Sequence, residues 1–218
     1  MKKAKICASI INNDLAAIKE IEPLVDLFEV RIDLVGDGWQ EIGRQLDKPW
    51  IACNRLPDEG GQWQGKEQLR IEQLAKSIEL GASIIDLELA TENLGEALAM
   101  LKNEARCILS YHDLQGTPPL ENLQEKVNQQ LQAGADICKV VTTANRFADN
   151  LITLQLISSF PDTEIVAFAM GEAGYLSRVL CPLVGGEFTY AAIQQGKEAA
   201  PGQIAVNDLV NIYQVVQR

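Results

Sequence analysis

The sequence predicts a single (β/α)₈ barrel, also called a TIM barrel, spanning residues 1–218. Three observations indicate this fold. Short apolar runs recur along the chain, and longer segments with the 3.6-residue period of amphipathic helices separate them. Most successive runs begin roughly 22 to 33 residues apart, the length of one βα unit. No linker, low-complexity tract or shift in composition marks a second domain.

The apolar runs are predicted to be strands with both faces buried. Most of them are continuous rather than alternating, as expected in a parallel sheet. Eight such runs follow one another, which matches the eight units of a barrel. They cover residues 5–11, 27–35, 50–55, 83–89, 107–113, 136–142, 164–170 and 184–191.

The segments between the runs are predicted to be helices. Residues 69–81 and 122–134 show helical periodicity and end in Gly81 and Gly134, a common signal at a helix C-terminus. An open, doubly wound sheet is the competing architecture. Because no G-x-G-x-x-G motif follows the first run, the barrel is favoured.

Composition and charge narrow the class of protein. Apolar residues make up 47% of the chain and charged residues 22%, which is typical of a globular protein. The net charge of −11 disfavours binding to nucleic acid or to an anionic membrane, because both require a basic face. No apolar run is long enough to span a bilayer, and the N-terminal apolar stretch ends at Asn12, too early for a signal peptide. We therefore expect a cytoplasmic protein.

The cysteine and histidine content favours no metal site. Five cysteines, an odd number, lie far apart without a C-x-x-C pair, so neither a disulfide framework nor a zinc site is expected. His112 is the only histidine. Any imidazole chemistry must therefore use His112.

Polar residues gather at the ends of the predicted strands, where barrels place their chemistry. Side chains alternate between the two faces of a strand, so Glu29, Arg31 and Asp33 share one face, and Asp86 and Glu88 share another. The other polar or soft residues at these ends are Arg55, His112, Asp113, Lys139 and Met170.

Lys139 stands in the middle of the apolar run 136–142. Burying an ammonium group is costly, so two explanations are open. In the first, Lys139 pairs with a carboxylate such as Asp86 or Glu88 and is purely structural. In the second, Lys139 is desolvated, its pKa falls towards neutrality, and its amine is a nucleophile for a ketone or aldehyde.

His112 ends the run before Lys139. A lone histidine is more often packed or solvated than catalytic, but the ends of neighbouring barrel strands lie side by side. An imidazole beside an imine-forming lysine would transfer a proton at the carbon next to the imine. Its pKa would suit this task without large tuning.

Arg55 and Glu59 lie in a Gly-rich turn after the third strand. They are either solvated charges of a plain turn, or contacts to a substrate oxygen and to His112. Spacing in the sequence does not choose between these two interpretations.

The loops after the last two strands, residues 170–178 and 198–204, lie where barrels often bind an anion. Arg178 and Gln203 offer donors there, and an arginine can bind a carboxylate through two parallel bonds. The alternative is an exposed helix residue and a plain turn.

Six motifs follow one another on the spacing of the eight strands: EVRIDLV (29–35), R-x-x-x-E-G-G (55–61), SYHD (110–113) with Thr117-Pro118, DICK (136–139), MGEAGYLSR (170–178) and APGQI (200–204). In this order they resemble the type I 3-dehydroquinate dehydratases, the Schiff-base enzymes of the shikimate pathway. The resemblance runs from the first strand to the last helix and so covers essentially the whole chain.

The resemblance implies a syn elimination of water from 3-dehydroquinate to 3-dehydroshikimate, without a cofactor or metal. By position, Lys139 would form an imine with the C3 ketone, and Glu59 would orient His112. The histidine would remove the C2 proton and then protonate the departing C1 hydroxyl. The implied substrate-binding positions are Glu29, Arg31 and Arg55 on the hydroxyl side, and Arg178, Ala199 and Gln203 on the carboxylate side.

Three positions depart from the family pattern. Asn54 stands where an aromatic is frequent, and Ala199 and Gly186 stand where serines are frequent, which would affect packing and substrate affinity more than chemistry. Two other functions stay open, a class I aldolase-like barrel and a barrel that binds a hydroxy acid without turnover. A carboxylate suits Arg178 and Gln203 better than an aldolase substrate does. The expected partner is a small molecule, and a homodimer is one expectation for the assembly.

Overall fold

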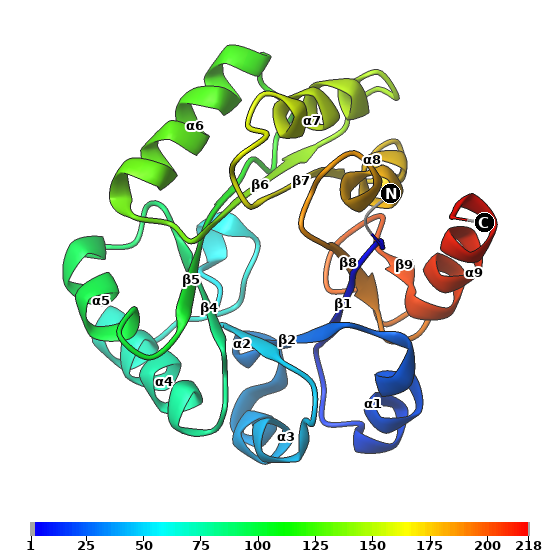
Figure 1. The fold of residues 1–218 in the computed structure, drawn as a ribbon. Coiled ribbons are helices and arrows are strands. Elements are labelled where there is room, and N and C mark those ends of the chain that lie inside the picture. The colour runs from blue at the N-terminus through cyan, green and yellow to red at the C-terminus, as the bar shows by residue number, and fades with distance from the viewer. Residues whose placement is uncertain (1–2, 218) are drawn as a thin grey trace.

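A computed structural model describes residues 3–217 as a ring of parallel strands surrounded by helices (Figure 1). The strands are β1 (Ile6–Ile10), β2 (Leu27–Arg31), β3 (Trp50–Cys53), β4 (Ile84–Glu88), β5 (Arg106–His112), β6 (Ile137–Thr143), β7 (Ile165–Met170), β8 (Thr189–Ala192) and β9 (Ile204–Ala205). The helices are α1 (Leu15–Ile21), α2 (Ile32–Val35), α3 (Trp39–Gln45), α4 (Glu67–Glu79), α5 (Leu94–Leu101), α6 (Leu120–Ala133), α7 (Asp149–Ser158), α8 (Tyr175–Leu180) and α9 (Val206–Val216). Short 3₁₀ turns are η1 (Glu22–Leu24), η2 (Gly36–Gly38), η3 (Pro57–Glu59) and η4 (Cys181–Leu183).

The sheet has the order β7-β6-β5-β4-β3-β2-β1-β8-β9, and every neighbouring pair is parallel. It curls until β7 meets β8, where the Glu187 amide donates to the Ile165 carbonyl at 2.8 Å. The rings of Phe168 and Tyr190 also meet across this closing pair. The (β/α)₈ barrel predicted from the sequence is therefore confirmed, with β9 as an extra two-residue strand beside β8.

The inward side chains change from apolar to polar along the even-numbered strands. Ile84 is followed two residues later by Asp86 on β4, and Ile137 by Lys139 on β6. The apolar members belong to one buried cluster that continues outward beneath α6 and α7, and residues beneath most of the other helices form a second cluster. Because side chains alternate along a strand, this pattern closes the floor of the barrel and leaves charges at its C-terminal end.

Two predicted strands extend too far. Residues 32–35 form α2 instead, because β2 ends where Asp33 folds back onto Arg31. Residues 184–188 form a turn before β8, in which Gly185 has a φ of +115°. An apolar run in the sequence does not show where a strand stops.

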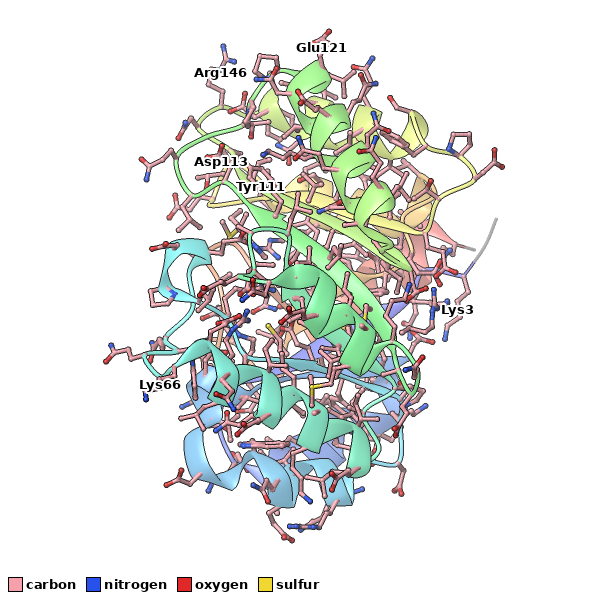
Figure 2. The ribbon with its side chains drawn as sticks, turned by 90° about the vertical axis from the view of Figure 1, so that its left-hand side faces the viewer. Lys3, Lys66, Tyr111, Asp113, Glu121 and Arg146 are labelled. Atoms are coloured by element: carbon pink, nitrogen blue, oxygen red, sulfur yellow. The ribbon has the colours of Figure 1, made fainter. Side chains whose placement is uncertain are left out.

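The C-terminal ends of the strands lie together at one end of the molecule. In Figure 2, Tyr111 and Asp113, at and just after the end of β5, lie near Arg146 and on the same side as Lys66, whereas Lys3 lies at the opposite end. Within residues 3–217, no helix combines the length and apolar character needed to cross a bilayer.

Candidate active site

A cavity of about 330 Å³ opens among the C-terminal ends of the strands. Its size suits a small-molecule ligand. All nine residues that the sequence singles out for chemistry or binding line its wall: Glu29, Arg31, Arg55, Glu59, His112, Lys139, Arg178, Ala199 and Gln203.

Lys139 lies at the base of the cavity in a layer built from the even-numbered strands. Its Nζ atom is 2.8 Å from Asp86 Oδ2 and 3.5 Å from Glu29 Oε1, and it lies 4.3 Å from the centroid of the Tyr190 ring. Alternate strands supply one layer of side chains in such barrels. Here that layer is polar where most are aliphatic.

The structure does not show the lowered pKa that the second explanation for Lys139 requires. Burial alone would lower this pKa, but the charges of Asp86 and Glu29 raise it above its ordinary value. In the substrate-free protein, Lys139 is therefore an ammonium ion paired with Asp86, a pairing that the sequence offered as one explanation. To act as a nucleophile it must first lose a proton.

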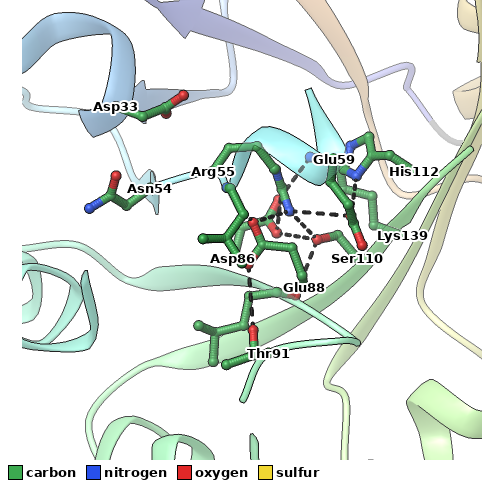
Figure 3. Close-up of polar contacts among 12 residues, drawn as sticks. Asp33, Asn54, Arg55, Glu59, Asp86, Glu88, Thr91, Ser110, His112 and Lys139 are labelled. Carbon is green, nitrogen blue, oxygen red and sulfur yellow. Dashed lines mark hydrogen bonds and ion pairs between the residues drawn. The ribbon is translucent and has the colours of Figure 1, made fainter. Parts of the chain in front are cut away.

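Arg55 connects the lysine pair to the rest of the site (Figure 3). Its Nη2 atom is 2.8 Å from Asp86 Oδ1, and its Nη1 atom donates to Ser110 Oγ at 2.7 Å and lies 3.1 Å from Glu88 Oε1. Burial would raise the pKa of Asp86, but Arg55 and Lys139 hold it well below its usual value. Asp86 therefore stays ionised between two cations.

The turn after β3 brings Glu59 to His112. Gly60 has a φ of +80°, and a Cβ atom on Gly61 would lie 2.0 Å from the Arg55 carbonyl oxygen. Only glycine allows the chain to close this tightly on itself. The closure sets Glu59 Oε2 2.7 Å from His112 Nδ1 and 3.7 Å from Arg55 Nη1 (Figure 3).

The Glu59–His112 pair has unusual proton affinities. Burial, together with the positive charges of Arg55 and Lys139, lowers the pKa of His112 well below its ordinary value. Burial also raises the pKa of Glu59 to about 7, against the opposing charge of Arg55. The expectation that His112 needs no large tuning is therefore wrong. At neutral pH its imidazole is uncharged, and Nδ1 is engaged by Glu59.

Arg31 is held by its neighbour Asp33. Its Nε and Nη2 atoms donate to the two carboxylate oxygens at 2.9 and 2.7 Å. Asp33 Oδ2 also accepts from the Gln62 amide at 3.0 Å, which anchors the end of the turn that carries Glu59. Arg31 therefore lines the cavity with its charge already balanced.

Arg178, on α8, is buried without a carboxylate. One of its amino groups donates to the Pro201 carbonyl at 3.2 Å, its Nε atom has no hydrogen-bond partner, and the guanidinium stacks 4.4 Å from the Phe168 ring centroid. Within residues 3–217 it forms no ion pair, and burial lowers its pKa to about 9. The cavity thus contains an uncompensated cation, which favours an anionic ligand.

Gln203 and its loop cover the cavity beside Arg178. Gln203 accepts from the Ala199 amide at 2.7 Å and donates to Ser9 Oγ at 3.1 Å, and Ser9 donates to Glu29 at 3.0 Å. A Cβ atom on Gly202 would lie 2.4 Å from the Gly171 carbonyl oxygen, so the loops after β7 and β8 meet closely only because position 202 is glycine.

Two of the departures from the family pattern lie outside the cavity wall. Gly186 precedes β8, and a Cβ atom there would lie 2.4 Å from Cys181 Sγ, so this position packs closely against the turn that follows α8. Asn54 is fully buried, and its side chain donates to Gln73 at 2.9 Å. Ala199 does line the cavity, and its missing hydroxyl leaves the backbone amide as its polar donor.

One group of side chains has ligand atoms close enough together to bind a metal ion. The ligand atoms of Glu29, Cys53 and Asp86 lie within 4.8 Å of one another in the described part of the chain. However, Lys139 and Arg55 already balance the two carboxylates, and burial raises the pKa of Cys53, so its thiol stays protonated. The donor set therefore fits the chain's own cations better than a metal ion.

Three residues that contribute to the site were not predicted from the sequence. Ser110 stands two residues before His112 and so shares its face, a signal that the alternation of strands offers. Tyr190 lies inside an apolar strand and reads as ordinary core. Arg70 donates to Glu88 Oε2 at 2.6 Å behind the site, and its alignment with the buried Leu74 on one face of α4 is the signal that it is buried.

Known proteins are similar to this chain in both sequence and fold. A family model described as type I 3-dehydroquinase matches residues 6–218. The 3-dehydroquinate dehydratase of Dehalococcoides mccartyi is 40% identical over 217 residues, covering 99% of this chain and 97% of that one. The enzyme of the same name from Methanocaldococcus jannaschii is 34% identical and covers 97% and 98%.

The solved structures agree in fold. The type I 3-dehydroquinate dehydratase of Clostridium difficile matches with a TM-score of 0.86 at 23% identity, over 98% of this chain and 92% of that one. A structure described as an aldolase reaches a TM-score of 0.60 at 14% identity over 99% and 97%, which is a likeness of fold alone. With the family model matching nearly its full length, the chain belongs to the type I 3-dehydroquinate dehydratases, hydro-lyases of the shikimate pathway.

Proposed function

We propose that the chain eliminates water from 3-dehydroquinate through a Schiff base on Lys139, with His112 as general base and acid and Glu59 as its orienting partner. One observation carries the proposal. A buried lysine and a neutral, carboxylate-held imidazole line the same cavity as Arg178, a cation without a counter-ion. The substrate supplies what this cavity lacks, because it has both a ketone and a carboxylate.

Substrate binding begins at Arg178. A carboxylate placed against its unpartnered Nε atom would restore charge balance in the buried wall. The ring is then fixed at one end, and the ketone carbon is directed to the Lys139 side of the cavity. Holding a reactant in this way converts a second-order encounter into an intramolecular step.

The covalent step needs the amine form of Lys139. The ammonium releases one proton to solvent, and the nitrogen attacks the C3 carbonyl carbon. The hydroxyl of the resulting carbinolamine takes up a proton and departs as water, which leaves a protonated imine. Its positive charge occupies the place of the former ammonium between Asp86 and Glu29, so the electrostatics of the site change little.

The elimination uses one imidazole twice. His112 is neutral, and with Glu59 ionised its Nδ1–H donates to Oε2, which leaves the lone pair of Nε2 for the C2 proton. The iminium accepts the electron pair as an enamine. The imidazolium then protonates the C1 hydroxyl, which departs as water, and a second water releases the product from Lys139.

The test combines turnover with covalent trapping. The protein is mixed with 3-dehydroquinate, the conjugated product is followed by ultraviolet absorbance, and borohydride is added before intact-mass analysis and peptide mapping. We expect product and a substrate-dependent adduct on Lys139. Product without an adduct, or an adduct on another residue, would contradict the Schiff-base mechanism.

A further inference from the structure

The ring of Tyr190 covers one side of the Lys139 ammonium. Nζ lies 4.3 Å from the ring centroid, within the range of a cation–π contact, and the tyrosine is only 3% exposed. Asp86 and Glu29 approach the same nitrogen. The lysine charge is therefore met by two carboxylates and one aromatic face.

The hydroxyl of Tyr190 does not explain the presence of this residue. It is buried and has no hydrogen-bond partner in the described chain, which costs free energy. Its ring, in contrast, is tightly oriented, because Phe168 and Phe188 contact it in edge-type geometry with centroids 6.0 and 5.4 Å away. The ring face is the part of the side chain that the site uses.

The two kinds of partner respond differently to covalent chemistry. An ammonium has three N–H donors for carboxylates, whereas a protonated imine keeps the positive charge but has one N–H. The number of hydrogen bonds that the nitrogen can donate to carboxylates therefore falls from three to one. A ring face attracts the charge itself, and the attraction is strongest where water is excluded.

We propose that Tyr190 is a positioning residue that stabilises the cationic forms of Lys139 through its ring face, above all the iminium. The iminium part rests on the proposed Schiff base, and the ammonium part does not. Titratable or charged groups from several elements and loops interact with Lys139: Cys7 on β1, Glu29 on β2, Cys53 at the end of β3 and Arg55 just after it, Glu59 in η3, Asp86 on β4, His112 on β5 and Tyr190 on β8.

Tyr190 contributes its ring and no charge of its own. Burial, with the nearby Glu29 carboxylate, raises the pKa of its phenol well above the ordinary value, so it stays neutral. Weakening the π system without changing shape therefore isolates the contribution of the ring.

The experiment uses the full chain with Tyr190→Phe as the reference. Phenylalanine analogues carrying one, two and three ring fluorines are then placed at position 190, because fluorine withdraws electrons from the ring face. In the free protein, the pKa of Lys139 is measured from the pH dependence of its reductive methylation, followed by mass spectrometry. We expect this pKa to fall stepwise, by about 1 across the series, which corresponds to a tenfold change in proton affinity.

The second readout is the fraction of protein trapped by borohydride at a fixed substrate concentration. It should fall in the same order as the pKa, and Tyr190→Leu should lie at the low end of both series. A flat pKa series with normal adduct formation would overturn the role of Tyr190 and leave the Schiff base standing. A graded pKa series in a protein that never forms an adduct would overturn the iminium part and the proposed mechanism together.

Discussion

The two halves of the cavity wall carry their charges in opposite ways. In the β2–β6 half, formed by Glu29, Arg55, Glu59, His112 and Lys139 and backed by Asp86, every cation contacts a carboxylate. The β7–β8 half is formed by Phe168, Arg178 and Gln203. Its buried guanidinium, that of Arg178, contacts the Phe168 ring and the Pro201 carbonyl. The charges of the first half are balanced within the protein, and those of the second half would be balanced by an anionic ligand.

Under the proposed function, the two halves would have separate tasks. A balanced network keeps its geometry while protons and an electron pair move through it, which is the preorganisation that catalysis needs. An unbalanced cation sacrifices stability for affinity, because its burial is offset only when an anion binds. Chemistry and recognition can therefore be altered separately.

The largest expected effect comes from removing Lys139, the proposed nucleophile of the β2–β6 half. Lys139→Ala should lower turnover by more than roughly 10⁴-fold, because the covalent route is lost. Lys139→Arg serves as the matched control, since it keeps a cation beside Asp86 and Glu29 but cannot form an imine. Circular dichroism and steady-state rates check both variants. Substantial activity in either one would break the assignment of chemistry to this half.

Removing His112, the proposed base, should separate the covalent step from the elimination. His112→Ala should still form the borohydride-trapped adduct on Lys139, while product appears about 10²–10⁴-fold more slowly. Single-turnover absorbance and intact mass measure the two steps. If no adduct forms, His112 acts before the elimination and the order of events is wrong.

Arg178→Leu sharpens the contrast, because it should weaken substrate binding while it raises the stability of the substrate-free fold. Losing a charged hydrogen bond to a carboxylate should raise KM about 10²-fold with a small change in kcat. The substrate-free protein should melt roughly 3 °C higher, since an unpaired buried cation is gone.

A surface arginine provides the control for Arg178. Arg44→Leu, on the exposed side of α3, removes the same charge without touching the cavity and should leave both KM and melting temperature close to the parent values. A melting temperature that drops in Arg178→Leu would show that this guanidinium is structural.

The smallest effect concerns the proton shared in the Glu59–His112 pair. The pKa of Glu59 is raised to about 7, so the carboxylate that orients His112 is lost as the pH falls through this value. We expect kcat/KM to decline on the acid side of pH 7 and Glu59→Gln to abolish that decline while lowering the rate about tenfold. An acid limb that persists unchanged in Glu59→Gln belongs to another group.

How far the sequence predicts this site differs between the two halves. Alternation along β4, β5 and β6 places Asp86, His112 and Lys139 on inward faces near the strand ends, so their meeting follows from the barrel. The burial of Arg178 does not follow, because α8 is only six residues long and has no clear apolar face. Its solvent exclusion depends on a loop around Pro201 that folds over from beyond β8.

Protonation states were the least predictable property. Burial and pairing shift the pKa of a lysine in opposite directions, and the sign depends on the 2.8 Å approach of Asp86, which comes from another strand. For His112 the nearby cations of Arg55 and Lys139 act in the same direction as burial. The net pKa shift of each group depends on distances between charges on different strands, and no pattern in the sequence encodes those distances.

The most direct test of the contrast between the halves measures two ligands on two proteins by calorimetry. The ligands are a cyclohexane polyol carboxylate without a ketone and its carboxamide, and the proteins are the parent chain and Arg178→Leu. We predict that the parent binds the carboxylate about 10²-fold more tightly than the amide, and that the variant binds both within about threefold. A preference for the carboxylate that survives in Arg178→Leu would contradict the account, because the balanced half would then be recognising the anion.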